Sequence, residues 1–208
     1  MVYAFLFRLP QRLVACYRGY RWAWQVLAAF ITAGLIFSGF DWWFFEHTRD
    51  VWRPFILMAG LGGFYMPIAI ALGLYAVGRR HAGVAVGQAS FLALVISTFY
   101  KVFAGRVQPE YLTHVQTFDY SHVFHFGIYA YSIFWGWPSS HAATAVAGMT
   151  ALYILWPNTL IRALCIVWAM LVCTGAAVGF HWFSDVVAGI VIGAVIGITV
   201  SKDSQMIE

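Results

Sequence analysis

Apolar segments of about 20 residues recur along the whole chain, and short polar breaks separate them. A segment of this length can span a hydrocarbon core of about 30 Å as an α-helix. Of the 208 residues, 62% are hydrophobic and only 10% are charged, whereas soluble domains carry roughly 25% charged residues. The sequence therefore predicts an all-α, polytopic helical bundle in a membrane and not a soluble domain.

Six segments are predicted to span the membrane. They are residues 22–40, 54–77, 83–104, 139–156, 160–180 and 184–200. We expect one six-transmembrane domain over residues 22–200. A basic interfacial segment over residues 1–21 precedes it, and a polar cytoplasmic tail over residues 201–208 follows it. A tail that is basic only because it lies on the cytoplasmic side is an equally good interpretation of residues 1–21.

The stretches between the predicted spans carry the aromatic and polar side chains found at membrane interfaces. Residues 41–53 are predicted to form a polar loop, and the longer stretch 105–138 is predicted to carry a short interfacial helix or a lid. Pro67 lies inside the second predicted span. It predicts a kink and not a break, because neighbouring helices can satisfy the freed backbone groups.

Basic residues are unevenly distributed over the two sides that six spans define. The side with both termini carries Arg8, Arg12, Arg18, Arg21, Arg79, Arg80, Arg162 and Lys202. The opposite side carries only Arg49, Arg53, Lys101 and Arg106. By the positive-inside rule we expect cytoplasmic termini. The small basic excess lies at membrane edges, so it indicates topology and lipid contact and not nucleic-acid binding.

His181 and Asp185 are four residues apart at the start of a predicted helix, so they share one face. A carboxylate in this position can hold the neutral imidazole in one tautomer, which leaves the other nitrogen free as a nucleophile. It can also stabilise the protonated form of the ring. The alternative is an interfacial histidine followed by an aspartate that the helix dipole favours. For the pair alone, this alternative is the better interpretation.

His141 follows Pro138, Ser139 and Ser140 at the start of the fourth predicted span. Proline and serine are ordinary residues at a helix start, and capping is the simpler interpretation of the serines alone. Free amides at a helix start also bind anions. Ser139 and Ser140 could therefore bind a phosphate, with His141 protonating a leaving oxygen.

Lys101 and Arg106 lie at the end of the third predicted span. Cations in this position usually extend to the interface. The alternative is a phosphate clamp, since Arg pairs two oxygens at once and Lys adds a point charge. The six-span topology places both cations on the same membrane side as His141, His181 and Asp185, although these residues are far apart in the chain.

In chain order, the sequence carries Lys-x4-Arg-x2-Pro, Pro-Ser-Ser-His and His-x3-Asp. This arrangement resembles the type-2 phosphatidic acid phosphatase superfamily of membrane lipid phosphatases, whose motifs are K-x6-R-P, P-S-G-H and S-R-x5-H-x3-D. The stretches in register with those motifs are Lys101-x6-Gln108-Pro109, Pro138-Ser139-Ser140-His141 and Thr174-Gly175-x5-His181-x3-Asp185. The resemblance extends from about residue 85 to residue 200.

The resemblance implies that His181 attacks phosphorus to form a phosphohistidine, that Asp185 orients it and that His141 protonates the leaving group. The implied phosphate-binding groups are Lys101, Ser139 and the amide of Ser140. No metal and no cofactor are implied. The implied substrate is a membrane lipid phosphate or diphosphate, such as lipid A, undecaprenyl diphosphate, phosphatidylglycerol phosphate or phosphatidic acid. The implied site faces the periplasm or exterior of a bacterial inner membrane.

Two arginines of the family motifs are replaced here, by Gln108 and Gly175. A hydrogen bond to a charged group is worth about 1.5–3 kcal/mol, so losing two could cost roughly two to four decades in rate. Arg106, which follows Gly105 as in some family members, is the candidate for one missing charge. Arg106 and Gln108 therefore join the candidate phosphate-binding residues.

Three functions remain open from the sequence: a phosphatase, a lipid phosphotransferase, and an impaired relative that binds or transports a lipid headgroup. We favour the enzyme, because a non-catalytic protein has little reason to keep both histidines and the aspartate at this spacing. A channel is disfavoured, since the centres of the predicted spans carry no charge. The long loop also carries His114, His122 and His125, which are expected to be surface or lid residues since their spacing matches no zinc pattern.

Overall fold

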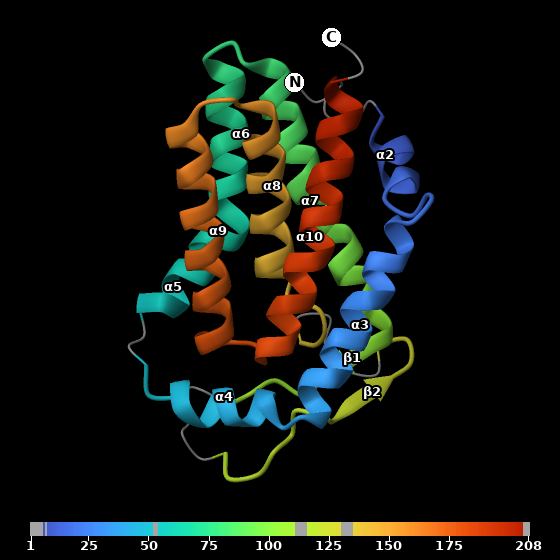
Figure 1. The fold of residues 1–208 in the computed structure, drawn as a ribbon, viewed down its shortest axis with the longest axis vertical. Coiled ribbons are helices and arrows are strands. Elements are labelled where there is room, and N and C mark those ends of the chain that lie inside the picture. Colours follow the sequence, from blue (N-terminus) through green and yellow to red (C-terminus); the bar gives the residue numbers. More distant parts are fainter. Residues whose placement is uncertain (1–5, 7, 52–53, 111–115, 130–134, 206–208) are drawn as a thin grey trace.

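The computed structural model describes residues 6, 8–51, 54–110, 116–129 and 135–205, and these are mostly helical (Figure 1). The elements in chain order are α2 (Leu9–Ala15), α3 (Arg21–Phe37), α4 (Phe40–Thr48), α5 (Pro54–Gly60), the π-helix η1 (Leu61–Tyr65), α6 (Met66–Ala76), α7 (Arg80–Phe103), β1 (Ala104–Arg106), β2 (Phe124–Phe126), α8 (Ser140–Leu155), α9 (Thr159–Gly179) and α10 (Phe183–Gln205). The long helices run side by side, and α4 lies across one end of the bundle.

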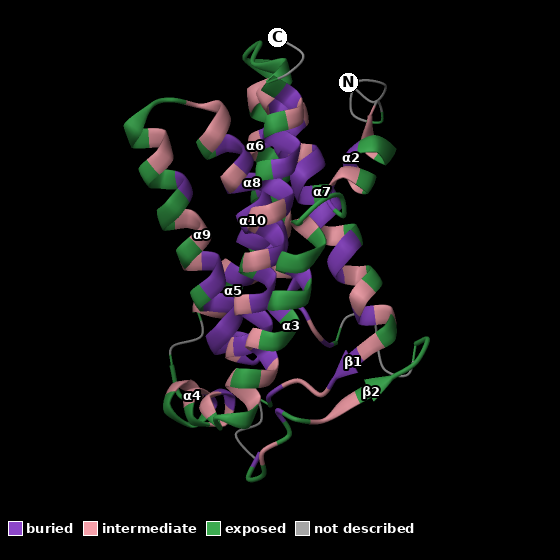
Figure 2. Ribbon diagram, turned by 45° about the vertical axis from the view of Figure 1, so that its right-hand side comes forward, coloured by how far each residue is buried: buried purple, intermediate pink, exposed green. Residues whose placement is uncertain are grey.

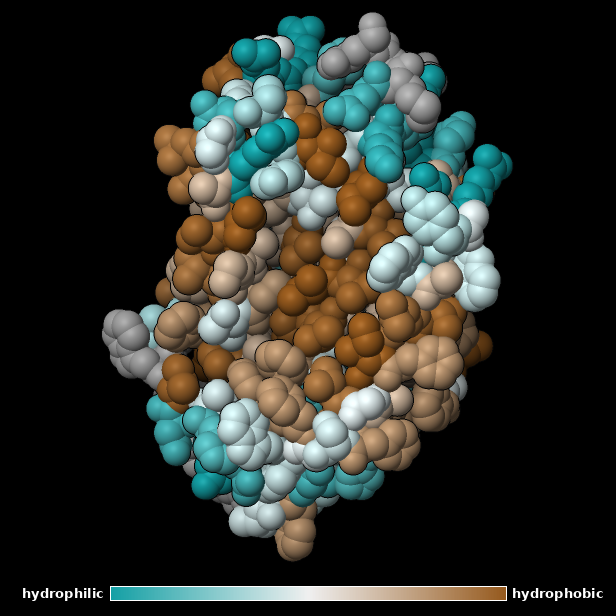
Figure 3. Space-filling view, in the orientation of Figure 1, coloured by the Kyte–Doolittle hydropathy of each residue, from teal (hydrophilic) through white to brown (hydrophobic). Residues whose placement is uncertain are grey.

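Within the described residues, four helices are long and apolar enough to cross a membrane, with mean hydropathy between 1.7 and 2.2. They are Pro54–Ala76, Arg80–Phe103, Thr159–Gly179 and Phe183–Gln205. Helices α3 and α4 meet at a 70° bend and provide a fifth span if the pair counts as one. Helix α8 is apolar but has only 16 residues. The six predicted spans are thus not confirmed. An apolar band between polar ends is nevertheless visible on the face in Figure 3.

Helix α8 is the most enclosed element, and the buried residues gather on it and on the helix faces turned toward it (Figure 2). The close contact with α10 depends on Gly189, Gly193 and Gly197. A Cβ added at any of the three would lie 2.5–2.6 Å from a backbone oxygen of the α8 segment. This small-residue repeat therefore provides close helix packing.

Helix α4 replaces most of the loop that was predicted over residues 41–53, so that prediction was wrong for residues 41–48. Its aromatic side chains find partners on the bundle, and this tertiary packing favours a helix. The ring of Phe44 lies 4.8 Å from that of Phe183, and the ring of Phe45 lies 5.7 Å from that of Trp182. Helix α4 is thereby held beneath the start of α10.

The stretch 105–138 contributes to an antiparallel pair of strands, in which Gly105 is paired with His125. Its described residues, 105–110, 116–129 and 135–138, contain no helix, so the predicted interfacial helix is not found there. Gly136 follows and packs on β1 with a φ of 131°. A Cβ at Gly136 would lie 3.0 Å from the amide nitrogen of Arg106, so only glycine allows this close approach.

The second predicted span is interrupted by η1, which precedes Pro67 at the start of α6. The segment Pro54–Ala76 nevertheless continues as one candidate span, and the kink at Pro67 stays a prediction. A π-turn is a feature often found at functional sites. Gly62 and Gly63 within η1 are buried. Their missing side chains let this turn approach α9 and the start of α8.

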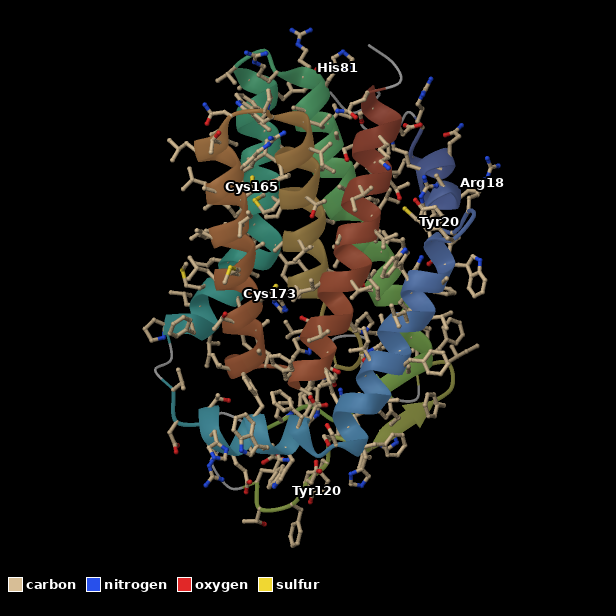
Figure 4. The ribbon with its side chains drawn as sticks, in the orientation of Figure 1. Arg18, Tyr20, His81, Tyr120, Cys165 and Cys173 are labelled. Carbon is tan, nitrogen blue, oxygen red and sulfur yellow. The ribbon has the colours of Figure 1, made fainter. Side chains whose placement is uncertain are left out.

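Part of the basic N-terminal segment is tied to the bundle. Arg12 of α2 is buried and donates hydrogen bonds to Asp203 and Ser204 at 2.7 Å each. Figure 4 places Arg18 and His81 near this end and Tyr120 at the opposite end. Residues 1–5 and 7 of the predicted interfacial segment lie outside the described residues.

Candidate active site

The two histidines of the motifs and their aspartate come together at the end of the bundle where α4 lies. His181, in the turn between α9 and α10, is 3% exposed. Its Nδ1 lies 3.5 Å from Oδ2 of Asp185, which has no hydrogen-bond partner in the described structure. The ring of His141 lies 6.0 Å from the ring of His181. The arrangement provides two neighbouring imidazoles, set edge to face, one of them beside a carboxylate.

Several influences act on the protonation of His181, and burial is the largest of them. It lowers the pKa of His181 below its ordinary value of about 6.5, and the cations of Lys101 and Arg106 act in the same direction. The neighbouring carboxylate of Asp185 opposes this shift. The balance favours a neutral imidazole, which is the form that can act as a nucleophile.

The serines before His141 form the start of α8. The Ser139 side chain caps this helix by accepting from the amide of Ala142 at 3.4 Å, so the capping interpretation is confirmed. The Ser139 amide donates to the backbone oxygen of Asp185 at 3.0 Å. Ser140 Oγ accepts from the hydroxyl of Ser97 at 3.0 Å. These bonds fix the start of α8 against α10 and α7, and they thereby fix His141 relative to His181.

Lys101 lies in the last turn of α7 and is only 4% exposed. Its charge interacts with Asp185 and with both His141 and His181. The side chain is therefore enclosed beside the histidines and does not extend to the interface. A buried cation in this place is suited to an anionic ligand.

Arg106 is completely buried in β1 and is paired with two carboxylates. Its Nη2 lies 2.7 Å from Oδ2 of Asp41, and its Nη1 contacts Oδ1 of Asp185. Its Nε donates to the Ser121 carbonyl at 2.8 Å, and Nη1 also donates to Ser184 Oγ at 2.9 Å. All three guanidinium nitrogens are thus engaged behind Asp185. Phosphate binding by Arg106 remains a prediction.

Asp41 is a residue that sequence reasoning missed. It is 1% exposed at the start of α4, and its carboxylate accepts from the Ser184 amide at 2.8 Å and from the Ser184 hydroxyl at 2.5 Å. The available signal was an acid inside an aromatic run, Phe40-Asp41-Trp42-Trp43. That run was interpreted as an exposed loop, where a carboxylate needs no partner.

The two positions that lack the family arginines have different surroundings. In the amide orientation that satisfies both ends of the side chain, Gln108 donates to His181 Nδ1 at 2.9 Å and accepts from the Gly136 amide at 3.0 Å. A Cβ at Gly175 would lie 2.3 Å from the Phe55 carbonyl oxygen. Helix α5 therefore occupies the space that a side chain at position 175 would need.

An apolar cleft of about 340 Å³ lies between α6 and α7 and extends to Phe64 of η1. Its lining includes Phe64, Ile68, Leu72, Tyr75, Phe91 and Leu94. The Phe64 ring also contacts the His141 ring, with centroids 4.4 Å apart. The cleft is therefore connected through one side chain to the pair of histidines.

The described residues contain no group of three or more His, Cys, Asp or Glu side chains that could hold a metal ion. His122 and His125 are exposed, and His114 lies outside the described residues. The described loop histidines thus do not join the cluster around His181.

Comparisons with known proteins identify the family. A sequence model of the PAP2 superfamily matches residues 82–207. The chain is similar to a PA-phosphatase related-family protein of Dictyostelium discoideum, with 27% identity over 170 residues, which cover 72% of this chain and 58% of the relative. The chain thus spans less than two thirds of that relative.

The fold is similar to that of a solved structure, the first transmembrane PAP2 type phosphatidylglycerolphosphate phosphatase from Bacillus subtilis. The TM-score is 0.61 at 16% identity, over 91% of this chain and 98% of that chain. At this identity the likeness shows the fold alone. It supports an integral membrane protein, and the family resemblance that the motifs predicted is confirmed. Since the superfamily model covers more than half of the chain, this protein belongs to the PAP2 superfamily.

Proposed function

We propose that this protein is a membrane phosphatase that hydrolyses a lipid phosphate or diphosphate through a phosphohistidine. The observation that carries the proposal is the placement of His181 3.5 Å from Asp185, with the His141 ring 6.0 Å away. Family membership supports the reaction class. The enclosed cation of Lys101 supports an anionic substrate.

The proposed reaction has two steps. His181 Nε2 attacks phosphorus while its Nδ1 proton is held by Asp185 Oδ2, and His141 donates a proton to the leaving oxygen as the P–O bond breaks. Water then attacks phosphorus as the P–N bond to His181 breaks, His141 accepts the proton of the attacking water, and phosphate leaves. Because Gln108 contacts the same Nδ1, its amide must turn away during the first step. It can then donate to a phosphate oxygen, as its place in the first motif predicts.

The apolar cleft favours a lipid substrate. It opens among apolar helices and reaches Phe64, which contacts His141. A hydrocarbon chain in the cleft would leave its phosphate near the histidines. The candidate substrates are lipid A, undecaprenyl diphosphate, phosphatidylglycerol phosphate and phosphatidic acid. We further propose six spans and cytoplasmic termini, which would place the site on the periplasmic or extracellular side.

A phosphotransferase is the second candidate, and a headgroup binder is the third. The neutral Gln108 and the filled space at Gly175 favour them, because the described site has fewer cations than the family motifs provide. A transferase would use the same phosphohistidine and pass the phosphoryl group to another lipid. A binder would hold the headgroup without breaking a bond.

The deciding experiment measures phosphate release by purified protein in detergent with a chelator present. The four candidate lipids are compared, each with a second lipid added as a phosphoryl acceptor. His181→Ala is the inactive variant, and His81→Ala is the matched control because His81 lies near the opposite end (Figure 4). Release that only His181→Ala abolishes supports the phosphatase. Transfer without release supports the transferase, and neither product from folded protein contradicts both.

The tight contact between η1 and His141 leads to a separate prediction. A Cβ at Gly63 would lie 2.9 Å from the Cα of His141, whereas a Cβ at Gly73 of α6 would meet nothing within 4 Å. We expect Gly63→Ala to displace His141 and lower kcat by on the order of 10- to 100-fold. Gly73→Ala makes the same chemical change and should leave kcat unaltered. A wild-type kcat for Gly63→Ala would show that η1 does not position His141.

A further inference from the structure

We infer that Asp41 is a positioning residue for the His181–Asp185 pair, an inference that rests on the proposed phosphatase function. Asp41 lies outside residues 82–207, the part of the chain that the superfamily model matches. It touches neither histidine in the described structure. It acts through two neighbours, Ser184 and Arg106. Both are completely buried, and both donate hydrogen bonds to the Asp41 carboxylate.

The first route runs through the start of α10. The Asp41 carboxylate accepts hydrogen bonds from both the amide and the hydroxyl of Ser184, the residue directly before Asp185. Ser184 lies in the first turn of α10, where free amides favour a carboxylate. A helix start is usually capped by a residue of its own chain segment, but here the carboxylate comes from α4, more than 140 residues earlier. Asp41 therefore fixes the turn that carries Asp185.

The second route runs through charge. The Arg106 guanidinium lies between two buried carboxylates, with Nη2 2.7 Å from Asp41 and Nη1 on Asp185. Charge-assisted bonds of this kind are strong where water is excluded. Without the Asp41 charge, Arg106 would act on Asp185 alone. Asp185 would then be a weaker acceptor for the Nδ1 proton of His181, and His181 would be a weaker nucleophile.

The surroundings of His181 limit the routes by which Asp41 can influence it. The ionisable groups that act on His181 are Lys101 from α7, His141 from α8, Arg106 from β1 and Asp185 from α10. The polar side chain of Gln108 contacts Nδ1 as well. Of these, only Arg106 is described in contact with Asp41. An effect of Asp41 on His181 must therefore pass through Arg106, Asp185 or the Ser184 turn.

The test compares Asp41→Asn with Asp203→Asn. Asp203 also pairs with an arginine at 2.7 Å, but it does so with Arg12 at the other end of the bundle. We expect Asp41→Asn to lower kcat by roughly 10- to 100-fold, as loss of a supporting hydrogen bond does in other sites, with KM changed by less than about threefold. The acid limb of the kcat profile should move to lower pH. Asp203→Asn should change neither kcat nor the limb.

A second readout needs no substrate. Nitrogen NMR of protein labelled in its histidine rings reports the protonation and tautomer of His181, with His181→Gln used for assignment. We expect the pKa of His181 to be lower in Asp41→Asn than in the wild type. If no lipid is turned over but this shift is present, the proposed function fails and the positioning role stands.

Unchanged NMR and unchanged kcat per folded molecule in Asp41→Asn would overturn the inference and leave Asp41 as an anchor for α4. If Asp41→Asn does not fold, Ser184→Ala takes its place. It removes the hydroxyl that Asp41 and Arg106 share and keeps the backbone amide. We expect shifts in the same direction but smaller, and their absence would equally overturn the inference.

Discussion

Replacement of His181 by glutamine is expected to lower phosphate release by on the order of 10⁴-fold or more, because loss of a nucleophile removes the covalent route altogether. Glutamine keeps a polar side chain of similar size in a site that is 3% exposed, so the fold should survive. The nearby His141 cannot substitute, since Oδ2 of Asp185 faces His181 and not His141.

Trapping of the covalent intermediate separates this explanation from a general loss of activity. The P–N bond of a phosphohistidine survives base and is lost in acid. A rapid quench in base, with substrate labelled in its phosphate, should therefore leave label on the wild-type protein. The label should disappear in His181→Gln and persist in His81→Ala. Base-stable label on His181→Gln would contradict the assigned nucleophile.

The pH profile tests the protonation of the same residue. Burial lowers the pKa of His181, so the neutral, nucleophilic form persists below its ordinary value of about 6.5. Activity should fall only as pH drops through this lowered pKa, and the acid limb of kcat/KM should lie below pH 6.5. A limb above that value would mean that Asp185 outweighs burial and the neighbouring cations.

The elements predicted best from the sequence are the helices formed by long, uninterrupted apolar runs. The helices α7, α9 and α10 lie within a few residues of the predicted spans, because apolar runs of this length have no other stable form in lipid. Helix α4 was missed since its packing partners, Phe183 and Trp182, are more than 130 residues away in the chain. Local pattern contains no information about such partners.

The candidate site likewise has residues that motif spacing predicts and contacts that only the structure shows. Lys101, His141, His181 and Asp185 were predicted from motif spacing, and the structure places them together. The contacts of Arg106 could not be predicted, because they depend on a buried acid that the motifs do not include. Likewise, Gly175 showed that an arginine was absent, but only the structure shows that the Phe55 carbonyl occupies its place.

Replacement of Asp185 by asparagine is expected to lower kcat by roughly 10³- to 10⁴-fold, as loss of the orienting carboxylate does in other histidine-based sites. The carboxylate can only accept a hydrogen bond from a protonated Nδ1, whereas the amide of asparagine can donate one to an unprotonated Nδ1. Gln108 already donates to Nδ1, so the variant would hold His181 with its proton on Nε2. That tautomer has no lone pair on the attacking atom. Nitrogen NMR of the His181 ring should report the change directly.

The comparison with Asp41→Asn separates orientation from charge. Each substitution leaves Arg106 with one carboxylate instead of two, so both should lower the free energy of unfolding by a similar amount, about 1–3 kcal/mol. Only Asp185→Asn also removes the acceptor for Nδ1, so its kcat should fall at least tenfold further at equal stability. Equal losses of kcat in the two variants would mean that the charge around Arg106, and not the tautomer of His181, limits the reaction.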